Sequence, residues 1–144
     1  MAEIQSWFLW AFLSAVFAAL TAIFAKVGLQ GVDSDLATLI RTAIILVVLA
    51  SFLYATGKWS NPFELSAKTW WFLTLSGLAT GVSWVCYFRA LKIGEASKVA
   101  PVDKLSLVLV VLFAVAFLNE RPSLREWLGI LLVSVGILVL AIKR

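Results

Sequence analysis

Ionised side chains inside strongly apolar segments are the residues of this chain best suited to chemistry. Arg41 lies well inside one apolar stretch, and Arg89 lies near the end of another. Asp103 and Lys104 come early in a third. An arginine at the centre of a bilayer costs about 2.5–3.5 kcal/mol, so such residues are retained for pairing or for function. Three cations and one carboxylate predict a positive substrate path that favours anionic or zwitterionic ligands; snorkelling or structural pairing is the alternative.

A second set of candidates shares one face of a predicted helix. Hydroxyl side chains recur there at helical spacing: Ser76, Thr80, Ser83 and Tyr87. Together with Trp84, the last two are candidates for lining a substrate path. Gly77 and Gly81 form a G-x-x-x-G notch, which lets another helix approach closely. The alternative is that this face only packs, with Trp84 buried and the hydroxyls bonded back to their own helical turn.

The residue types of common catalytic and metal sites are scarce. The sequence has no histidine, and Cys86 is its only cysteine, so zinc or haem sites of the usual kinds and an intrachain disulfide are not expected. No paired carboxylates share a face, and no nucleophile lies in a known motif. We therefore predict no enzyme activity, no catalytic residue, no metal and no cofactor. No basic run is dense enough to predict nucleic-acid binding.

The elements that must position these residues are membrane helices. Of the 144 residues 62% are hydrophobic and 14% are charged, and no charge occurs between Glu3 and Lys26. About 20 apolar residues span the hydrocarbon layer as a helix. We predict an all-α membrane protein, a single domain over residues 1–144. Its five transmembrane helices are expected at about 6–26, 36–54, 69–92, 98–118 and 124–142. Little chain remains outside them, so a binding site must lie between helices.

Capping residues mark several helix ends. The candidate N-caps are Asp33, Ser34, Asp35, Ser97 and Ser123. Glu126 follows Ser123 by three residues, which predicts a capping box and a tight hairpin between the last two helices. Gly94 predicts the end of the third helix. With Ser97 as the cap, Pro101 falls in the first turn of the fourth helix, where its missing N–H is harmless.

Tryptophan and basic residues predict the orientation of the spans. Five spans place the termini on opposite sides, and one interface then carries Trp7, Trp10, Trp59, Trp70, Trp71 and Trp127. The basic residues on that side are Lys58, Lys68, Arg121 and Arg125. The opposite side has Lys26, Lys92, Lys98, Lys143 and Arg144, with the embedded Arg41, Arg89 and Lys104 in addition. The bias favours a cytoplasmic C-terminus, but it is weak enough for some copies to insert the other way.

Several segments carry a family resemblance. In the C-terminal half they are the run from Ala90 to Pro101, the triplet Asn119-Glu120-Arg121 and the segment from Gly129 to Gly136. More weakly, Trp10–Leu29 and Arg41 resemble a first helix and a second-helix arginine. These residues resemble the EamA-like unit of the drug/metabolite transporter superfamily. The whole chain is similar to the short, single-unit, five-helix branch of that family.

The resemblance implies a secondary transporter in the inner (plasma) membrane. Larger members carry two five-helix units in inverted orientation, so this chain is expected to work as a homodimer, antiparallel in one arrangement, or with a second five-helix subunit. The implied activity is export of a small polar or amphipathic metabolite by alternating access. Small multidrug exporters of the superfamily use a glutamate in the first helix, which this chain lacks. Coupling to protons would therefore need Asp103.

Two alternative functions stay open from the sequence. One is a non-transporting accessory subunit whose small-residue faces bind a larger membrane complex. The other is a component of a lipid-carrier flippase, which a lateral opening lined by Arg41 and Arg89 would favour. The expected partners of a transporter are a small-molecule substrate and membrane lipids.

Overall fold

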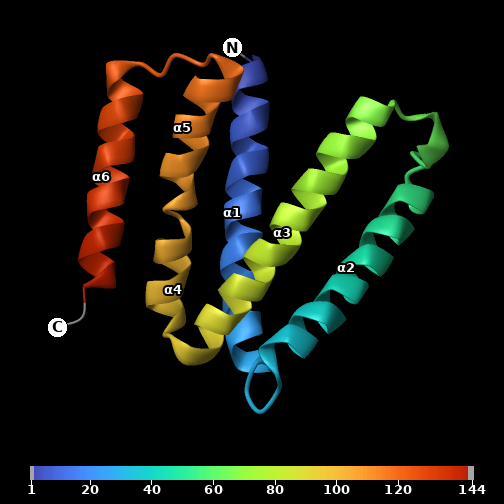
Figure 1. Ribbon diagram of the computed structural model, residues 1–144, viewed down its shortest axis with the longest axis horizontal. Coiled ribbons are helices and arrows are strands. Elements are labelled where there is room, and N and C mark those ends of the chain that lie inside the picture. The colour runs from blue at the N-terminus through green and yellow to red at the C-terminus, as the bar shows by residue number, and fades with distance from the viewer. Residues whose placement is uncertain (1, 143–144) are drawn as a thin grey trace. The chain divides into compact units, whose positions relative to one another are not determined.

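The structure, a computed structural model, describes residues 2–142 and contains no β-strand in that range. Its elements are α1 (Ala2–Gly28), α2 (Ser34–Ala55), the short 3-10 helix η1 (Pro62–Glu64), α3 (Ala67–Ile93), α4 (Ala96–Asp103), α5 (Ser106–Leu118) and α6 (Leu124–Ala141) (Figure 1). Five helical segments are long and apolar enough to cross a membrane, α4 and α5 together forming one of them. The predicted all-α membrane fold is confirmed.

The chain divides into two compact units, Met1–Ile93 and Gly94–Arg144, and each is described by itself. The single domain over residues 1–144 therefore stays a prediction. Side chains are described from Trp7 to Ile142. Lys143 and Arg144, two of the basic residues in the orientation argument, lie outside the described residues.

Polar caps start two helices where the sequence predicts them. The Asp33 carboxylate accepts hydrogen bonds from the backbone N–H groups of Asp35 and Leu36, at 2.9 and 3.1 Å, at the start of α2. At the start of α6, the Ser123 hydroxyl accepts from the N–H of Glu126, whose carboxylate accepts from the N–H of Ser123. This is the predicted capping box. Such side chains supply acceptors for N–H groups that have no partner within the helix.

The fourth predicted helix, over residues 98–118, is interrupted, and two expectations about it are wrong. Because α4 begins at Ala96, Ser97 lies inside the helix instead of capping it, and Pro101 lies in the second turn instead of the first. A proline at that position leaves a carbonyl of the preceding turn without its N–H partner. After Pro101 the backbone N–H groups donate to the carbonyl three residues earlier instead of four. The first of these bonds runs from the N–H of Lys104 to the carbonyl of Pro101, at 2.9 Å. A separate helix, α5, follows.

In the first unit, α3 packs against both α1 and α2. The buried apolar side chains of this unit are Ala22, Leu29, Phe88 and Leu91, and its buried hydroxyl residues are Ser34 and Thr38. They belong to the C-terminal parts of α1 and α3 and to the first turns of α2. These parts meet at the end of the unit that carries the α1–α2 loop (Figure 1). Apolar burial in this unit is therefore concentrated near one end.

Two lysines tie the last turn of α3 to its neighbours at the same end. The Lys26 ammonium on α1 donates to the carbonyl of Leu91 at 2.6 Å. The Lys92 ammonium donates to the carbonyl of Val32, in the α1–α2 loop, at 2.8 Å. The last carbonyls of a helix have no intrahelical donor, so Lys26 satisfies a group that the helix itself leaves open.

A bidentate ion pair joins α2 to α3. Arg89 Nε donates to Asp35 Oδ1 at 2.9 Å, and Arg89 Nη2 donates to Asp35 Oδ2 at 2.6 Å. The two parallel bonds match the planar fork of a guanidinium to the two oxygens of a carboxylate. From the sequence, Asp35 is a candidate helix cap and Arg89 is a candidate for the positive substrate path. The ion pair between the two residues is not predicted. It is a contact between residues far apart in the chain.

In the second unit, α4 and α5 each pack against α6. At the end of α5, Asn119 has a left-handed backbone (φ 55°), and its N–H and that of Glu120 both donate to the carbonyl of Ala114. A short connector then leads to the capping box at Ser123. The predicted hairpin between the last two helices is confirmed. Ala114 and Ile137 are the buried apolar residues of the described part of this unit.

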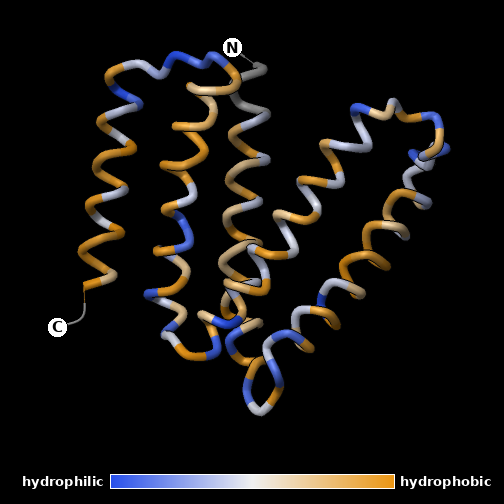
Figure 2. Tube along the Cα trace, viewed as in Figure 1, coloured by the Kyte–Doolittle hydropathy of each residue, from blue (hydrophilic) through white to orange (hydrophobic). Residues whose placement is uncertain are grey.

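Most large apolar side chains point away from the protein. Hydrophobic residues follow the long helices over most of their length (Figure 2). Most of the large hydrophobic side chains among the described residues are exposed. Several hydroxyl groups in the spans are bonded within their own helix: Thr42 Oγ1 donates to the carbonyl of Thr38 at 2.7 Å, and Thr80 Oγ1 to that of Ser76 at 2.9 Å. Hydrocarbon offers polar groups no partners, so internal bonding suits a lipid-facing helix. Thr80, one of the four hydroxyl residues predicted to share a face of α3, therefore bonds back to its own helix, as the packing alternative expects.

Exchanging the charges of the ion pair tests how α2 and α3 are held. Arg89→Asp should lower the unfolding temperature of the purified protein in detergent by a few degrees, because it replaces an exposed ion pair, which contributes little, with two like charges. Adding Asp35→Arg should recover most of the loss, because the pair re-forms with reversed sign. Arg125→Asp, at an exposed position on α6, is the matched control. A double variant as unstable as Arg89→Asp would contradict the contact.

Candidate functional site

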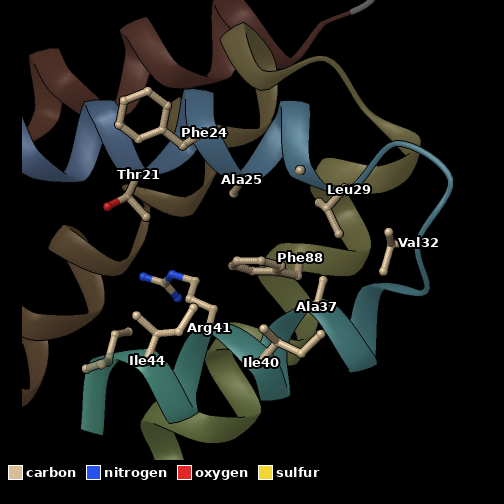
Figure 3. Close-up of a pocket in the computed structure, with 12 residues that line it drawn as sticks. Thr21, Phe24, Ala25, Leu29, Val32, Ala37, Ile40, Arg41, Ile44 and Phe88 are labelled. Atoms are coloured by element: carbon tan, nitrogen blue, oxygen red, sulfur yellow. The ribbon is translucent and has the colours of Figure 1, made fainter. Parts of the chain in front are cut away.

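A cavity of about 550 Å³ lies in the first unit, where α1, α2 and α3 meet (Figure 3). Its side-chain lining is apolar except for Thr21 and Arg41, and Phe24, Ile40, Ile44 and Phe88 form much of the wall. Cavities of this size and composition are typical of small-molecule sites, in which a few polar groups orient the ligand. The cavity is therefore the candidate site.

Helical spacing brings Arg41 into this cavity. Ala37, Ile40, Arg41 and Ile44 follow one another on α2 at steps of three, one and three residues, and all four line the cavity. Residues three and four apart share one face of a helix, so the face that is apolar at Ile40 and Ile44 carries the guanidinium between them. Figure 3 shows the Arg41 side chain extending from α2 toward the side of the cavity where Thr21 lies.

The guanidinium of Arg41 lies over two aromatic rings of α3. Its central carbon is 4.6 Å from the ring centre of Trp84 and 5.2 Å from that of Phe88. The two rings are four residues apart and so occupy adjacent turns of one helical face. Such a cation–π contact contributes about 0.5–1 kcal/mol at exposed sites and about 2 kcal/mol when desolvated. Two residues proposed separately from the sequence, Arg41 and Trp84, are thus joined in one contact.

No carboxylate forms an ion pair with Arg41 among the described side chains. The acid closest to it in sequence on α2, Asp35, is occupied on both oxygens by Arg89. Arg89 therefore acts as a tie between helices, whereas Arg41 keeps a positive charge that the described carboxylates do not neutralise. This difference separates two arginines that look alike in the sequence.

Asp103 and Lys104 lie at the end of α4, in the second unit. The Lys104 ammonium donates to the Asp103 carboxylate at 3.3 Å, so Asp103 has a cation as its partner. Both side chains are substantially exposed. Their predicted role with Arg41 in one substrate path stays a prediction.

Four further candidates from α3 lie outside the lining of the cavity. Ser83 is exposed, and the ring of Tyr87 meets that of Phe88 edge-on with centres 6.3 Å apart. Their predicted path roles stay predictions. A Cβ built on Gly77 or Gly81 would meet nothing within 4 Å, so in this unit the notch is unfilled. Its helix-packing role also stays a prediction, and a partner there would come from outside the unit.

A second cavity of about 550 Å³ lies in the second unit, between α5, α6 and their connector. Glu120, Arg121 and Glu126 contribute its charged side chains. Glu126 is already engaged in the capping box. Charges of both signs line this cavity, so it lacks the single uncompensated charge that marks the Arg41 cavity.

Comparison with known proteins decides the family. The EamA-like transporter family matches residues 5–142, nearly the whole chain. The chain belongs to the EamA-like transporter family. The resemblance seen in the sequence is therefore confirmed, and this EamA-like chain is a multi-pass membrane protein of a transporter family rather than of an enzyme family.

Individual relatives extend this result. A Sinorhizobium protein described as an uncharacterized transporter in the cobO 3′ region is 58% identical and is covered over 98% of its length by 96% of this EamA-like chain. The uncharacterized transporter YvbV of Bacillus subtilis is 30% identical over 90% of this chain, which covers only 43% of YvbV. A Hamiltonella defensa protein, the probable 4-amino-4-deoxy-L-arabinose-phosphoundecaprenol flippase subunit ArnE, is 31% identical over 60% of this chain and 76% of its own. No solved structure matches.

A double-mutant cycle tests the contact between Arg41 and Trp84. Arg41→Gln and Trp84→Leu should each destabilise the purified EamA-like chain, and together they should cost less than the sum by about 0.5–1 kcal/mol, because each removes the same cation–π contact. Thermal or denaturant unfolding in detergent measures the coupling. The control cycle pairs Arg41→Gln with Trp71→Leu, at an exposed position on the same helix. Additive effects in both cycles would show that the stack contributes nothing.

Proposed function

We propose that this chain forms one half of a secondary transporter, which exports a small polar or amphipathic metabolite by alternating access. The observation that carries the proposal is the cavity of this EamA-like chain, apolar in its walls and charged at Arg41. A site of this kind binds a ligand by shape and one strong electrostatic contact. Rocking of one five-helix unit against another would expose such a site to each side in turn.

A second copy of the chain is the proposed other half. YvbV is more than twice as long as the part that this chain covers, which fits a transporter built from two units. The weak difference in basic residues between the two sides would let copies insert in both orientations. The open notch at Gly77 and Gly81 offers a surface on α3 where a helix of another subunit can approach closely. A second five-helix subunit would serve the same purpose.

The proposed location is the inner (plasma) membrane. The side of the membrane with more basic residues is expected to be cytoplasmic, which places the C-terminus of that copy in the cytoplasm. In an antiparallel dimer the partner copy has the reverse orientation. Asp103 is the proposed acid for proton coupling, because it is an acidic residue inside the fourth span. Its cationic partner, Lys104, is exposed. Membrane lipids surround both copies.

A lipid-carrier flippase component is the second candidate function. The similarity to ArnE favours it, since that protein is described as a flippase subunit for an arabinose-modified lipid phosphate. A cavity with apolar walls and a cation suits such a ligand as well. A non-transporting accessory subunit is the remaining alternative, and its mark would be a specific partner protein together with no flux.

Flux through reconstituted vesicles tests the transporter proposal. Vesicles containing the purified protein are loaded with a small-molecule cell extract, and mass spectrometry follows which compounds leave the lumen. We expect selective loss of a few compounds with the wild-type protein and at least about tenfold slower loss with Arg41→Gln, because a charge-assisted contact is removed. Asp103→Asn should abolish any dependence on a pH gradient, and Arg125→Gln should behave as wild type. No selective loss under any gradient would overturn the proposal.

Labelling of single cysteines in cells tests the antiparallel dimer. Cys86→Ser removes the native thiol, and one new cysteine is then placed next to either terminus. An impermeant thiol reagent should label both ends, each in a fraction of the molecules. Labelling of one end alone would rule out the inverted pair and leave a parallel dimer or a second subunit. Permeabilised cells, in which both positions must react fully, are the control.

A further inference from the structure

The charge of the Arg41 cavity indicates which class of ligand it can bind. Arg41 brings the one ionised side chain to a lining that is otherwise apolar apart from Thr21, within the described residues. Asp35 does not compensate it, because Arg89 holds both oxygens of that carboxylate. A cationic ligand would meet repulsion there, and an uncharged sugar would find few hydrogen-bonding groups. An anion is the charged chemistry that complements this lining.

The contacts of the Arg41 guanidinium indicate how the anion would bind. Trp84 and Phe88 lie against the guanidinium at 4.6 and 5.2 Å from its central carbon to their ring centres. A cation–π contact does not use up the N–H donors of the guanidinium, and these form a fork that fits a carboxylate or phosphate through two bonds. The Thr21 hydroxyl lies on the same side of the cavity and can add a third polar contact (Figure 3).

The remaining walls describe the rest of the ligand. Phe24 on α1 and Ile40 and Ile44 on α2 are apolar lining residues, so two different helices offer apolar surface to the rest of the ligand. A volume of about 550 Å³ accommodates a chain or ring system of several carbon atoms beyond a head group. For a ligand that enters from water, burial of its apolar part against these side chains adds to the affinity.

We infer that the Arg41 cavity binds an amphipathic anion, with a carboxylate or phosphate at the guanidinium and an apolar body against the α1 and α2 walls. This names the ligand class of the proposed transporter and rests on the proposed function only for the transport step. Binding itself needs no flux. The anion is either the head group of a membrane lipid or a smaller amphiphile, and both share the chemistry that Arg41 recognises.

Equilibrium binding tests the inference without a transport assay. Radiolabelled octyl phosphate is bound to the wild-type protein in phosphatidylcholine nanodiscs, with protein-free nanodiscs as the background. Unlabelled octyl phosphate should compete, whereas octanol and octyltrimethylammonium, which keep the tail and change the head, should compete at least about tenfold more weakly. Equal competition by the three compounds would overturn the inference, and this comparison requires no variant that must fold.

Variants then assign the head group to Arg41. Arg41→Gln should weaken binding of octyl phosphate about tenfold or more, and Arg41→Lys should fall between, because lysine keeps the charge but not the fork. Arg125→Gln, which removes an exposed arginine outside both cavities, is the matched control and should bind as wild type. Binding that is unchanged by Arg41→Gln, or equally weakened by Arg125→Gln, would contradict the site.

The source of the anion is separated by changing the nanodisc. If phosphatidylglycerol in the disc displaces octyl phosphate, a membrane lipid occupies the cavity, and if it does not, the ligand is a smaller amphiphile; both results keep the inference. Charge-selective binding at Arg41 together with no flux in vesicles would overturn the proposed transport function and keep the inference about the ligand. Flux of compounds without charge-selective binding would instead overturn the inference and keep the transporter.

Discussion

The bidentate contact between Asp35 and Arg89 sets which turns of α2 and α3 meet, and the arrangement of the Arg41 cavity follows from that pairing. This unit buries few side chains, so its three helices are held near one end by polar contacts as much as by packing. The same contact occupies the carboxylate closest in sequence to Arg41 on α2. One ion pair therefore fixes α2 on α3, and its carboxylate forms no ion pair with Arg41.

The lipid-facing character of the chain explains why so little polarity is left for a site. Backbone groups are satisfied within helices, and several hydroxyls, such as Thr42 and Thr80, turn back to their own carbonyls. Lysines at the helix ends are bonded to backbone carbonyls of neighbouring segments. What remains inside the first unit is the Arg41 guanidinium on its aromatic support and the nearby Thr21. Binding by one charge and an apolar wall, as we propose for this cavity, uses the polar groups that are left there.

The spans and caps could be predicted from the sequence because they depend on local features. Length, hydropathy and the Ser123–Glu126 spacing fixed five segments and one capping box to within a few residues. The interruption of the fourth span was missed because a start two residues later made Pro101 look harmless. The tie between Asp35 and Arg89, and the place of Phe88 in the cavity, were missed for another reason. They depend on which helix faces meet, and periodicity within one helix carries no information about its neighbour.

The interruption between α4 and α5 has a consequence for how faces are assigned along this span. A 3-10 stretch advances about 120° per residue, compared with about 100° in an α-helix, so each such residue turns the following face by about 20°. A helical wheel drawn through residues 98–118 as one regular helix therefore misplaces the side chains of α5 relative to Asp103. The residues of α5 that share a face with this carboxylate are therefore different from those that the regular wheel selects.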